Sequence, residues 1–204
     1  KAILDFGCGA GAFCLNLKRL GATDITGVDV DNELLAIAQS RFEDYYKNGY
    51  KIAKINYIDG KYSLPFRDKE FDIVCANAVM EHVFPSQRKF VLNELWRVLN
   101  KNGLLIINAT PNRLWIKEAH TSNLFFLNYL PLNLAALIAR RFSDRVPPNQ
   151  STETLLSRGF RGCTYWEIKR NLKNPICINE KLRKAELHVW MKTWRNKNDS
   201  RFKR

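Results

Sequence analysis

The chain has 204 residues, of which 46% are hydrophobic and 12% aromatic, enough for one domain with a substantial core. Its net charge of +13 lies almost entirely in the second half, because residues 1–112 carry 14 Lys and Arg against 13 Asp and Glu, whereas residues 113–204 carry 19 against 7. No apolar stretch is long and unbroken enough for a transmembrane helix, and the cysteines show neither a CxxC pair nor metal-ligand spacing, which indicates free thiols in a reducing compartment.

The chain starts with an apolar strand that ends at Asp5 and continues into a glycine-rich loop with Gly7, Gly9 and Gly11. Residues without a Cβ can adopt unusual backbone angles and let a ligand approach the main chain closely. Residues 12–20 then predict a helix, since apolar residues recur at helical spacing and a glycine follows at the position of a C-cap. A strand, a glycine loop and a helix in this order predict a nucleotide-cofactor loop.

A second apolar strand, residues 25–28, leads to Asp29, about twenty residues after the loop. An acidic side chain at this place can accept hydrogen bonds from both ribose hydroxyls of a nicotinamide or an adenosyl cofactor. The glycine spacing also fits the dinucleotide fingerprint, so it does not name the cofactor. A plainer alternative is that Asp29 and Asp31 cap the helix predicted over residues 33–47.

Five further segments follow in a fixed order. They are residues 55–60 (INYIDG), 63–66 (SLPF), 71–77 (FDIVCAN), 80–83 (MEHV) and 97–108 (RVLNKNGLLIIN). This series, over residues 1–112, closely resembles the class I S-adenosylmethionine-dependent methyltransferases. The resemblance implies an α/β fold of the Rossmann-like, doubly wound type, with a mainly parallel sheet and a helical C-terminal lid.

The resemblance also implies S-adenosylmethionine as the cofactor. Asp5 and the glycine loop would hold its methionine part, and Asp29 its ribose. Asp59 would accept from the adenine amino group. The residues assigned to the cofactor in this way are Asp5, Phe6, Gly7, Cys8, Gly9, Gly11, Asp29, Val30, Asp59, Gly60 and Asn77. Each acid alone can be read as a turn former or a helix cap, but acids after three successive strands favour a ligand site.

Methyl transfer from a sulfonium is an in-line displacement, in which the protein mainly orients the reactants and excludes water. A hydroxyl or amine acceptor would still gain from a neutral histidine beside the methyl group. His82, directly after the fourth strand, and His120, beyond the fifth strand and paired with Glu118, are the candidates. His82 can equally be a structural residue, and His188, among basic residues, is predicted to be neither.

Residues 80–83 also resemble the ubiquinone-biosynthesis O-methyltransferases, in which an additional glutamate three residues before the Glu-His pair contributes to a metal site. Ala78 occupies that position here, so we expect no bound metal. The motifs of amino-methylating and cytosine-5 DNA methyltransferases are missing, because no Pro-Pro pair follows Asn77 and Cys75 lies inside a strand. Thr110-Pro-Asn112 recurs in methyltransferases that act on small-molecule and lipid acceptors.

The basic second half is harder to interpret. Residues 124–139 predict two short helices around Pro131, which either form a lid over an apolar acceptor or dip into a membrane surface, with Arg140 and Arg141 as anchors. Packing against the sheet is the alternative. Residues 175–179 are a short strand candidate, and no sixth or seventh strand can be placed with it. The last segment predicts a basic amphipathic helix whose apolar face holds Leu187, Trp190, Met191 and Trp194.

The sequence therefore predicts one domain, with a cofactor-binding core over residues 1–112 and a basic acceptor lid and extension over residues 113–204. Related methyltransferases usually carry helices ahead of the first strand, so we expect this core to be truncated at its N-terminus. The predicted function is methyl transfer to an oxygen, with a nitrogen as the second choice, of a small-molecule or lipid-like acceptor, in the cytoplasm or peripherally at a membrane. An RNA methyltransferase that uses the basic region, and a catalytically inactive cofactor-binding scaffold, are the alternatives.

Overall fold

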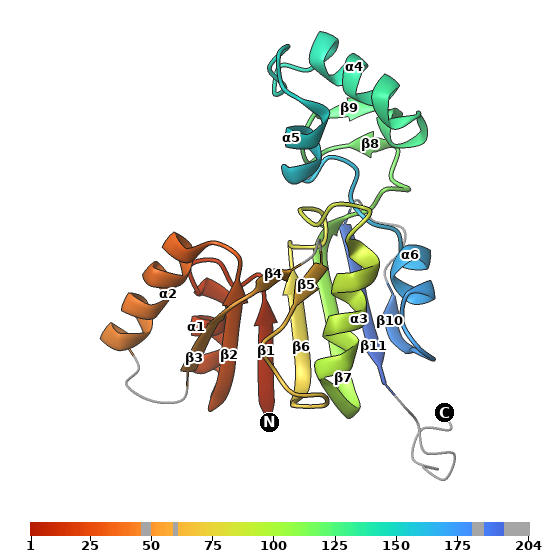
Figure 1. The fold of residues 1–204 in the computed structure, drawn as a ribbon. Coiled ribbons are helices and arrows are strands. Elements are labelled where there is room, and N and C mark those ends of the chain that lie inside the picture. Colours follow the sequence, from red (N-terminus) through yellow and green to blue (C-terminus); the bar gives the residue numbers. More distant parts are fainter. Residues whose placement is uncertain (46–49, 59–60, 181–185, 194–204) are drawn as a thin grey trace.

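A computed structural model describes residues 1–45, 50–58, 61–180 and 186–193 (Figure 1). Its centre is a seven-stranded sheet in the order β10-β11-β7-β6-β1-β2-β3. The strands are β1 (Ala2–Phe6), β2 (Asp24–Asp29), β3 (Tyr50–Lys54), β6 (Phe71–Asn77), β7 (Leu99–Pro111), β10 (Ile176–Glu180) and β11 (Glu186–Lys192). The first five are parallel, and β11 runs antiparallel to both of its neighbours. The predicted α/β fold with a mainly parallel sheet is confirmed.

Helices connect three of the four successive pairs of parallel strands, as is usual for parallel crossovers. They are α1 (Ala12–Arg19), α2 (Asn32–Tyr45) and α3 (Arg88–Val98), and a short hairpin of β4 (Asn56–Ile58) and β5 (Lys61–Ser63) precedes β6. After β1 the chain moves outward to β2 and β3, and then returns to place β6 on the other side of β1. The strand order therefore reverses between β1 and β6, and ligands of open α/β sheets bind beyond the carboxyl ends of the strands at such a reversal.

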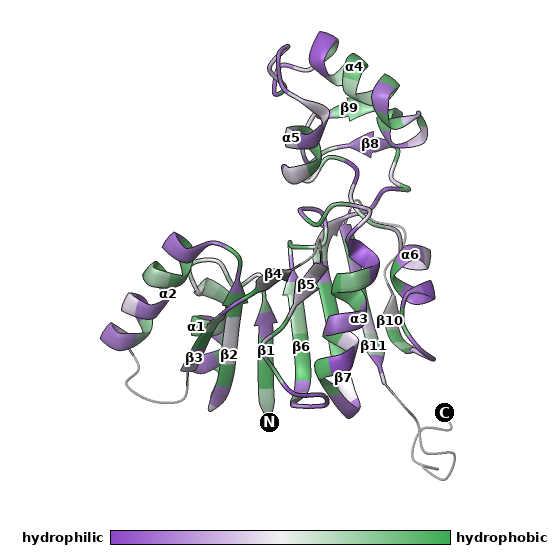
Figure 2. Cartoon of the chain, viewed as in Figure 1, coloured by the Kyte–Doolittle hydropathy of each residue, from purple (hydrophilic) through white to green (hydrophobic). Residues whose placement is uncertain are grey.

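The central strands are buried on both faces, which explains their nearly continuous apolar sequences. One face packs with α3 and with α6 (Tyr165–Arg170), through a core that includes Leu4, Val74, Leu95 and Ile168. The opposite face packs with α1 and α2 through a second cluster, which includes Cys14, Ile25 and Phe42. In Figure 2 much of β6 and β7 is correspondingly green, whereas the helices alternate between purple and green along their length.

Residues 113–160 form a small subdomain beyond the carboxyl ends of the strands (Figure 1). It contains β8 (Lys117–Glu118), β9 (Leu124–Phe125), the 3-10 helix η1 (Leu127–Tyr129), α4 (Leu132–Phe142) and α5 (Thr152–Ser157). Its core is a separate cluster, with Ala136, Leu155 and Phe160 fully buried. Around Pro131 we predicted two short helices. The structure has the 3-10 helix before this proline and the α-helix after it, and these elements pack on each other rather than on the sheet.

The prediction for the C-terminal segment is wrong. Leu187 and Met191 lie in strand β11, not in a helix, and their side chains alternate with exposed ones along it. These residues have a spacing that fits both a helix and a strand, and the open edge of the long strand β7 decides between them, since β11 pairs with it. Trp194, on the same predicted helical face, lies outside the described residues.

The strand candidate at residues 175–179 is confirmed as β10, so the sheet has both of the strands that the sequence left unplaced. The helix predicted over residues 33–47 is α2, which the structure describes as far as Tyr45. All five cysteines lie in the described part of the chain, and none of them forms a disulfide. Among the described residues, no helix reaches the length and apolarity that crossing a bilayer would require.

Candidate active site

The glycine loop between β1 and α1 has the backbone that a close-approaching ligand requires. Gly7, Gly9 and Gly11 all have positive φ, at 74°, 51° and 79°. A Cβ added to Gly7 would lie 2.5 Å from a methyl group of Val79, so this position is restricted to glycine by space as well as by conformation. No described side chain caps α1, and its first turn has no acidic residue. Its N–H groups therefore face the loop as donors for an anionic group.

Two carboxylates stand at the ends of the neighbouring strands. Asp5 is only 2% exposed and accepts a hydrogen bond from the Cys14 thiol, at 3.1 Å. Burial raises the pKa of Asp5 to about 6. Asp29 accepts from the Gly9 amide at 2.8 Å and from the amide of Val30 at 2.7 Å, so it fixes the glycine loop against the end of β2.

The predicted cap alternative is realised by the next acid along the chain. Asp31 accepts from the amides of Glu33 and Leu34 in the first turn of α2. Asp29 makes three backbone contacts, with Gly9, Val30 and Asp31. Since an ionised carboxylate offers about four acceptor sites, it keeps room for one further donor.

The other predicted cofactor residues are distributed as follows. Phe6 and Cys8 are buried members of the two core clusters, so only their backbone can face a ligand, whereas Val30 is about half exposed. The side-chain nitrogen of Asn77 is buried and has no hydrogen-bond partner among the described residues. An unsatisfied buried amide at the carboxyl end of β6 is a donor to which a bound ligand can supply the partner. Asp59 and Gly60 lie outside the described residues.

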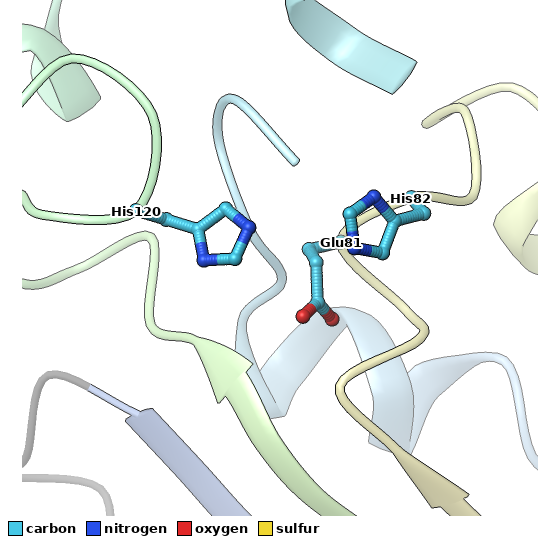
Figure 3. Close-up of side chains that lie close together, drawn as sticks. All are labelled: Glu81, His82 and His120. Carbon is cyan, nitrogen blue, oxygen red and sulfur yellow. The ribbon is translucent and has the colours of Figure 1, made fainter. Parts of the chain in front are cut away.

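Beyond Asn77, the loop of residues 78–83 leads from the glycine loop toward the subdomain. Val79 in this loop contacts Gly7. Glu81 and His82, also in this loop, lie close to His120 of the subdomain (Figure 3). One carboxylate oxygen of Glu81 and one ring nitrogen of each histidine lie within 4.8 Å of one another, a spacing that could also hold a metal ion, and the centroids of the two imidazole rings are 5.8 Å apart. The fold thus brings Glu81 and His82, which follow β6, close to His120, which follows β8.

Glu81 is the buried member of this cluster, at 1% exposure. Its Oε2 accepts from the Thr110 hydroxyl at 3.2 Å, while its Oε1 has no partner among the described residues. Burial raises the pKa of Glu81, and the two nearby histidines act in the opposite direction. A carboxylate in this position can stabilise a proton on either imidazole, because it is poorly solvated and lies between them.

The two histidines are held differently. His82 Nδ1 lies 2.8 Å from the carbonyl oxygen of Ser157. A carbonyl only accepts, so Nδ1 carries the proton, and in the neutral ring Nε2 is free to accept another. His120 packs on Gly159, where an added Cβ would lie 2.6 Å from the ring. It also lines a cleft of about 140 Å³ between the end of β7 and the subdomain, together with Asn112, Asn128 and Gly162.

Glu118 does not occupy the place that we predicted for it beside the imidazole of His120. Its buried carboxylate accepts from the backbone amides of His120, Thr121 and Ser122, and from the Ser122 hydroxyl at 2.6 Å. It therefore shapes the loop that presents His120. The sequence analysis missed Glu81 as the carboxylate of the cluster. Its adjacency to His82 was the available signal, but only the fold brings it to His120.

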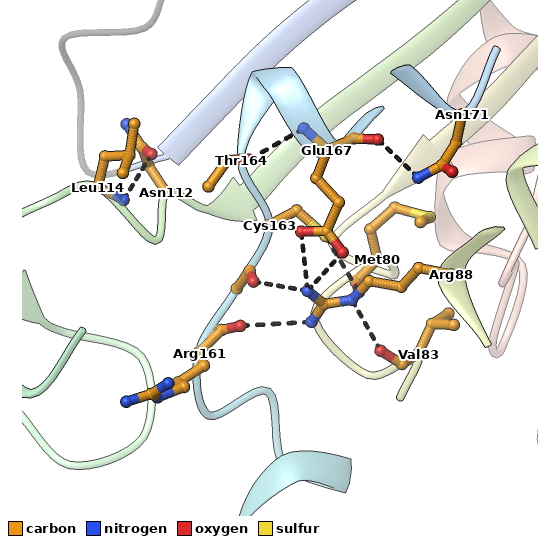
Figure 4. A network of polar contacts seen from close by, with 11 residues as sticks. Met80, Val83, Arg88, Asn112, Leu114, Arg161, Cys163, Thr164, Glu167 and Asn171 are labelled. Atoms are coloured by element: carbon orange, nitrogen blue, oxygen red, sulfur yellow. Dashed lines mark hydrogen bonds and ion pairs between the residues drawn. The ribbon is translucent and has the colours of Figure 1, made fainter. Parts of the chain in front are cut away.

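A buried arginine connects the loop of residues 78–83 to the segment that follows the subdomain (Figure 4). Arg88 is 1% exposed and donates to the carbonyls of Val83 and Gly162, at 3.0 and 2.8 Å. It also forms an ion pair with Glu167 of α6, at 3.4 Å. One guanidinium thus joins the end of the loop of residues 78–83 to residues 161–167, the segment by which the chain returns from the subdomain.

Comparison with known proteins agrees with this arrangement. A family model described as a methyltransferase domain matches residues 4–107, about half of the chain. The chain belongs to the methyltransferase domain family. The matched residues run from β1 to β7, and so include the glycine loop, Asp29, Asn77 and Glu81 of this methyltransferase domain.

Curated relatives at about 30% identity are also named as methyltransferases. A mitochondrial ubiquinone biosynthesis O-methyltransferase of Dictyostelium discoideum is 29% identical over 66% of this chain and 39% of its own length. A ubiquinone biosynthesis O-methyltransferase of Bradyrhizobium diazoefficiens is 31% identical over 76% of this chain and 56% of its own length. The chain therefore spans about half the length of these relatives. A SAM-dependent methyltransferase of Methanosarcina mazei has the same fold, with a TM-score of 0.65 and 19% identity, over 94% of this chain and 92% of that one.

S-adenosylmethionine is the cofactor of this family, and the residues present fit it. The uncapped α1 and the glycine loop can bind a carboxylate, the unsatisfied amide of Asn77 can donate to the cofactor, and Asp29 retains one acceptor site at the end of β2. The geometry of Gly7 and Val79 places this methyltransferase domain's cofactor loop in contact with the loop that carries Glu81 and His82.

Proposed function

We propose that the chain transfers the methyl group of S-adenosylmethionine to an oxygen of a small-molecule or lipid-like acceptor. The observation that carries this proposal is the cluster of Glu81, His82 and His120. Glu81 and His82 lie on the loop that contacts the glycine loop, and His120 lines the cleft next to β7. In this proposal residues 1–112 bind the cofactor, and residues 113–160 cover the acceptor.

The bound cofactor supplies an activated methyl group, so the protein needs to orient the acceptor and take up its proton. His120 lines the cleft and accepts the proton of the acceptor hydroxyl as that oxygen forms its bond to carbon. Glu81 stabilises the imidazolium that results, since its unpaired oxygen lies in the same cluster. His82, whose Nδ1 is fixed by the Ser157 carbonyl, is the second base candidate, and its free Nε2 supports this role.

An oxygen acceptor is favoured over a nitrogen by the relatives, two of which are named as O-methyltransferases. An RNA acceptor is supported by the basic charge alone, and eight of the nineteen cations of residues 113–204 lie outside the described residues. A lipid-like acceptor would bring the chain to a membrane surface. The cysteine content supports a cytoplasmic location, as none of the five forms a disulfide.

The test is methyl incorporation from labelled S-adenosylmethionine into separate small-molecule, lipid and RNA fractions. We expect label in the first or second fraction. His120→Gln should lower the rate by about 100-fold or more while leaving S-adenosylhomocysteine affinity unchanged, because general base catalysis typically contributes this much. His188→Gln, in β11, is the matched control.

Other outcomes have defined meanings. Label in RNA alone would refute the acceptor class, and binding of the cofactor without incorporation into any fraction would favour the scaffold. Unchanged turnover in His120→Gln with a large loss in His82→Gln would transfer the role of base to His82.

A further inference from the structure

The subdomain exposes a concentration of large apolar side chains that its own core does not use. Six of them lie in two short segments that contact each other, with exposures between 36% and 59%: Leu114, Trp115, Ile116, Phe125, Phe126 and Tyr129. We refer to these six as the apolar face. Exposed hydrophobic residues are ordinary when scattered, but a contiguous group of this size marks an interaction surface.

Hydrogen bonds between the two segments make the apolar face continuous. The amide of Phe126 donates to the carbonyl of Ile116 at 2.7 Å, and the Tyr129 hydroxyl donates to the carbonyl of Leu114 at 2.7 Å. Asn128 donates to the carbonyl of Trp115 at 2.9 Å. These contacts satisfy the nearby backbone, so the face can leave water without stranding those polar groups.

The neighbouring helix α4 carries further exposed apolar side chains. It packs on η1, and its Leu134, Leu137 and Arg141 follow one another at helical spacing on the exposed side. Phe142, at its end, is 67% exposed. In Figure 2 this helix and the β8–β9 pair lie together at the end of the molecule farthest from the N-terminus.

The charges around the apolar face have one predominant sign. Residues 113–145 contain five Lys and Arg against two acids, of which Glu118 is buried and occupied by its own loop. The Lys117 ammonium lies 5.2 Å from the centre of the Phe125 ring, and the Arg141 guanidinium 5.3 Å from that of Phe142. Cations are therefore placed among exposed aromatic rings rather than on a separate polar surface.

From this combination we infer that the apolar face docks on a membrane surface that contains anionic phospholipid. Aromatic and aliphatic side chains insert at the boundary of headgroups and acyl chains, while Lys and Arg beside them contact lipid phosphates. The inference goes beyond the catalytic cluster. It rests on the proposed function only where it names the membrane as the source of a lipid-like acceptor.

The test is co-flotation with vesicles of phosphatidylcholine alone and of phosphatidylcholine with phosphatidylglycerol. We expect binding to the anionic vesicles, weakened by salt, and a loss of about tenfold or more in Phe125→Ser/Phe126→Ser, since burying one such ring contributes about that factor. Leu20→Ser is the matched control, because Leu20 is 85% exposed at the end of α1, outside the subdomain. It should bind as the unchanged chain does.

A second variant, Lys117→Glu/Arg141→Glu, tests the charge contribution with the apolar face intact, and should remove the preference for anionic vesicles. Urea unfolding of each variant shows whether it folds. The inference is overturned if the unchanged chain does not float with anionic vesicles, or if the Phe125/Phe126 variant binds equally well. It is also overturned, in favour of RNA, if poly(U) competes with vesicles and binds the Phe125/Phe126 variant but not the Lys117/Arg141 variant. Co-flotation does not measure methyl transfer, so a negative result refutes membrane docking and leaves the proposed function untouched.

Discussion

Gly7→Ala should damage both stability and cofactor binding, by an amount that can be worked out from the loop. A non-glycine residue at a φ of +74° costs about 1–2 kcal/mol in backbone strain. The new Cβ would lie 2.5 and 2.9 Å from the two methyl groups of Val79, which adds about 1–3 kcal/mol of overpacking. Together the free energy of unfolding should fall by about 2–5 kcal/mol.

Gly21→Ala separates these two contributions. Gly21 has a φ of +92°, and nothing lies within 4 Å of the position of its added Cβ. It should therefore show the backbone strain alone, about 1–2 kcal/mol. Urea denaturation measures both variants, and calorimetric titration with S-adenosylhomocysteine measures the effect on the cofactor site. Only Gly7→Ala should weaken binding, by about tenfold or more, because only its Cβ displaces the loop of residues 78–83.

Combining Val79→Ala with Gly7→Ala tests whether the clash with Val79 causes the loss of stability and affinity. Val79→Ala removes both methyl groups that the Cβ of Gly7→Ala would meet, so the double variant should recover most of the overpacking contribution and part of the affinity. Equal destabilisation by Gly7→Ala and Gly21→Ala, or strict additivity of Gly7→Ala with Val79→Ala, would refute the argument that Val79 connects the glycine loop to the loop that carries Glu81 and His82.

Three further substitutions test the interior. The pKa of Asp5 is raised from 3.8 to about 6, so the folded state binds the proton more tightly, and stability from this group falls as the pH rises from about 4 to about 6. Asp5→Asn should remove a decrease of roughly 3 kcal/mol in urea unfolding across that window, and a pH profile parallel to that of the unchanged chain would contradict this. Arg88→Met should cost about 3–5 kcal/mol, because it leaves Glu167 without its buried partner, whereas Lys51→Met, which breaks the exposed pair with Asp24, should cost about 1 kcal/mol or less. Glu118→Gln should lower the free energy of unfolding by about 2 kcal/mol, because the backbone amides that donate to the charged carboxylate lose that acceptor. The loop around His120 should then become sensitive to limited proteolysis. Resistance equal to that of the unchanged chain would argue against the role of Glu118 in shaping this loop.

The features that the sequence predicted well are local. The strand, glycine loop and helix that end at Arg19 follow from neighbouring residues, since positive φ at Gly7 and Gly11 and the apolar spacing of the helix need no distant partner. The strand ends are equally local: β2 ends at Asp29 as predicted, and β1 ends at Phe6, one residue beyond the predicted Asp5.

The features that failed depend on distant contacts. The apolar spacing of Leu187 and Met191 fits both a helix and a strand, and the pairing of β11 with β7 decides it. The nearness of Glu118 to His120 along the chain suggested a pair, but its carboxylate is consumed by three amides of its own loop. The carboxylate that does meet His120 is 39 residues earlier, so only the folded chain reveals it.

The separate core of residues 113–160 makes the subdomain an exchangeable module. The chain enters it after β7 and leaves it before α6, and a bridge between Asn112 and Cys163 holds the two crossings side by side. Insertions and substitutions among its surface residues would leave the cofactor loop and the parallel strands untouched, since Leu155 and Phe160 pack within the module. Under the proposed function, in which this module covers the acceptor, new acceptor preferences would arise by replacement of one continuous stretch of gene, while the bonds from Arg88 to Val83 and Gly162 stay in place outside it.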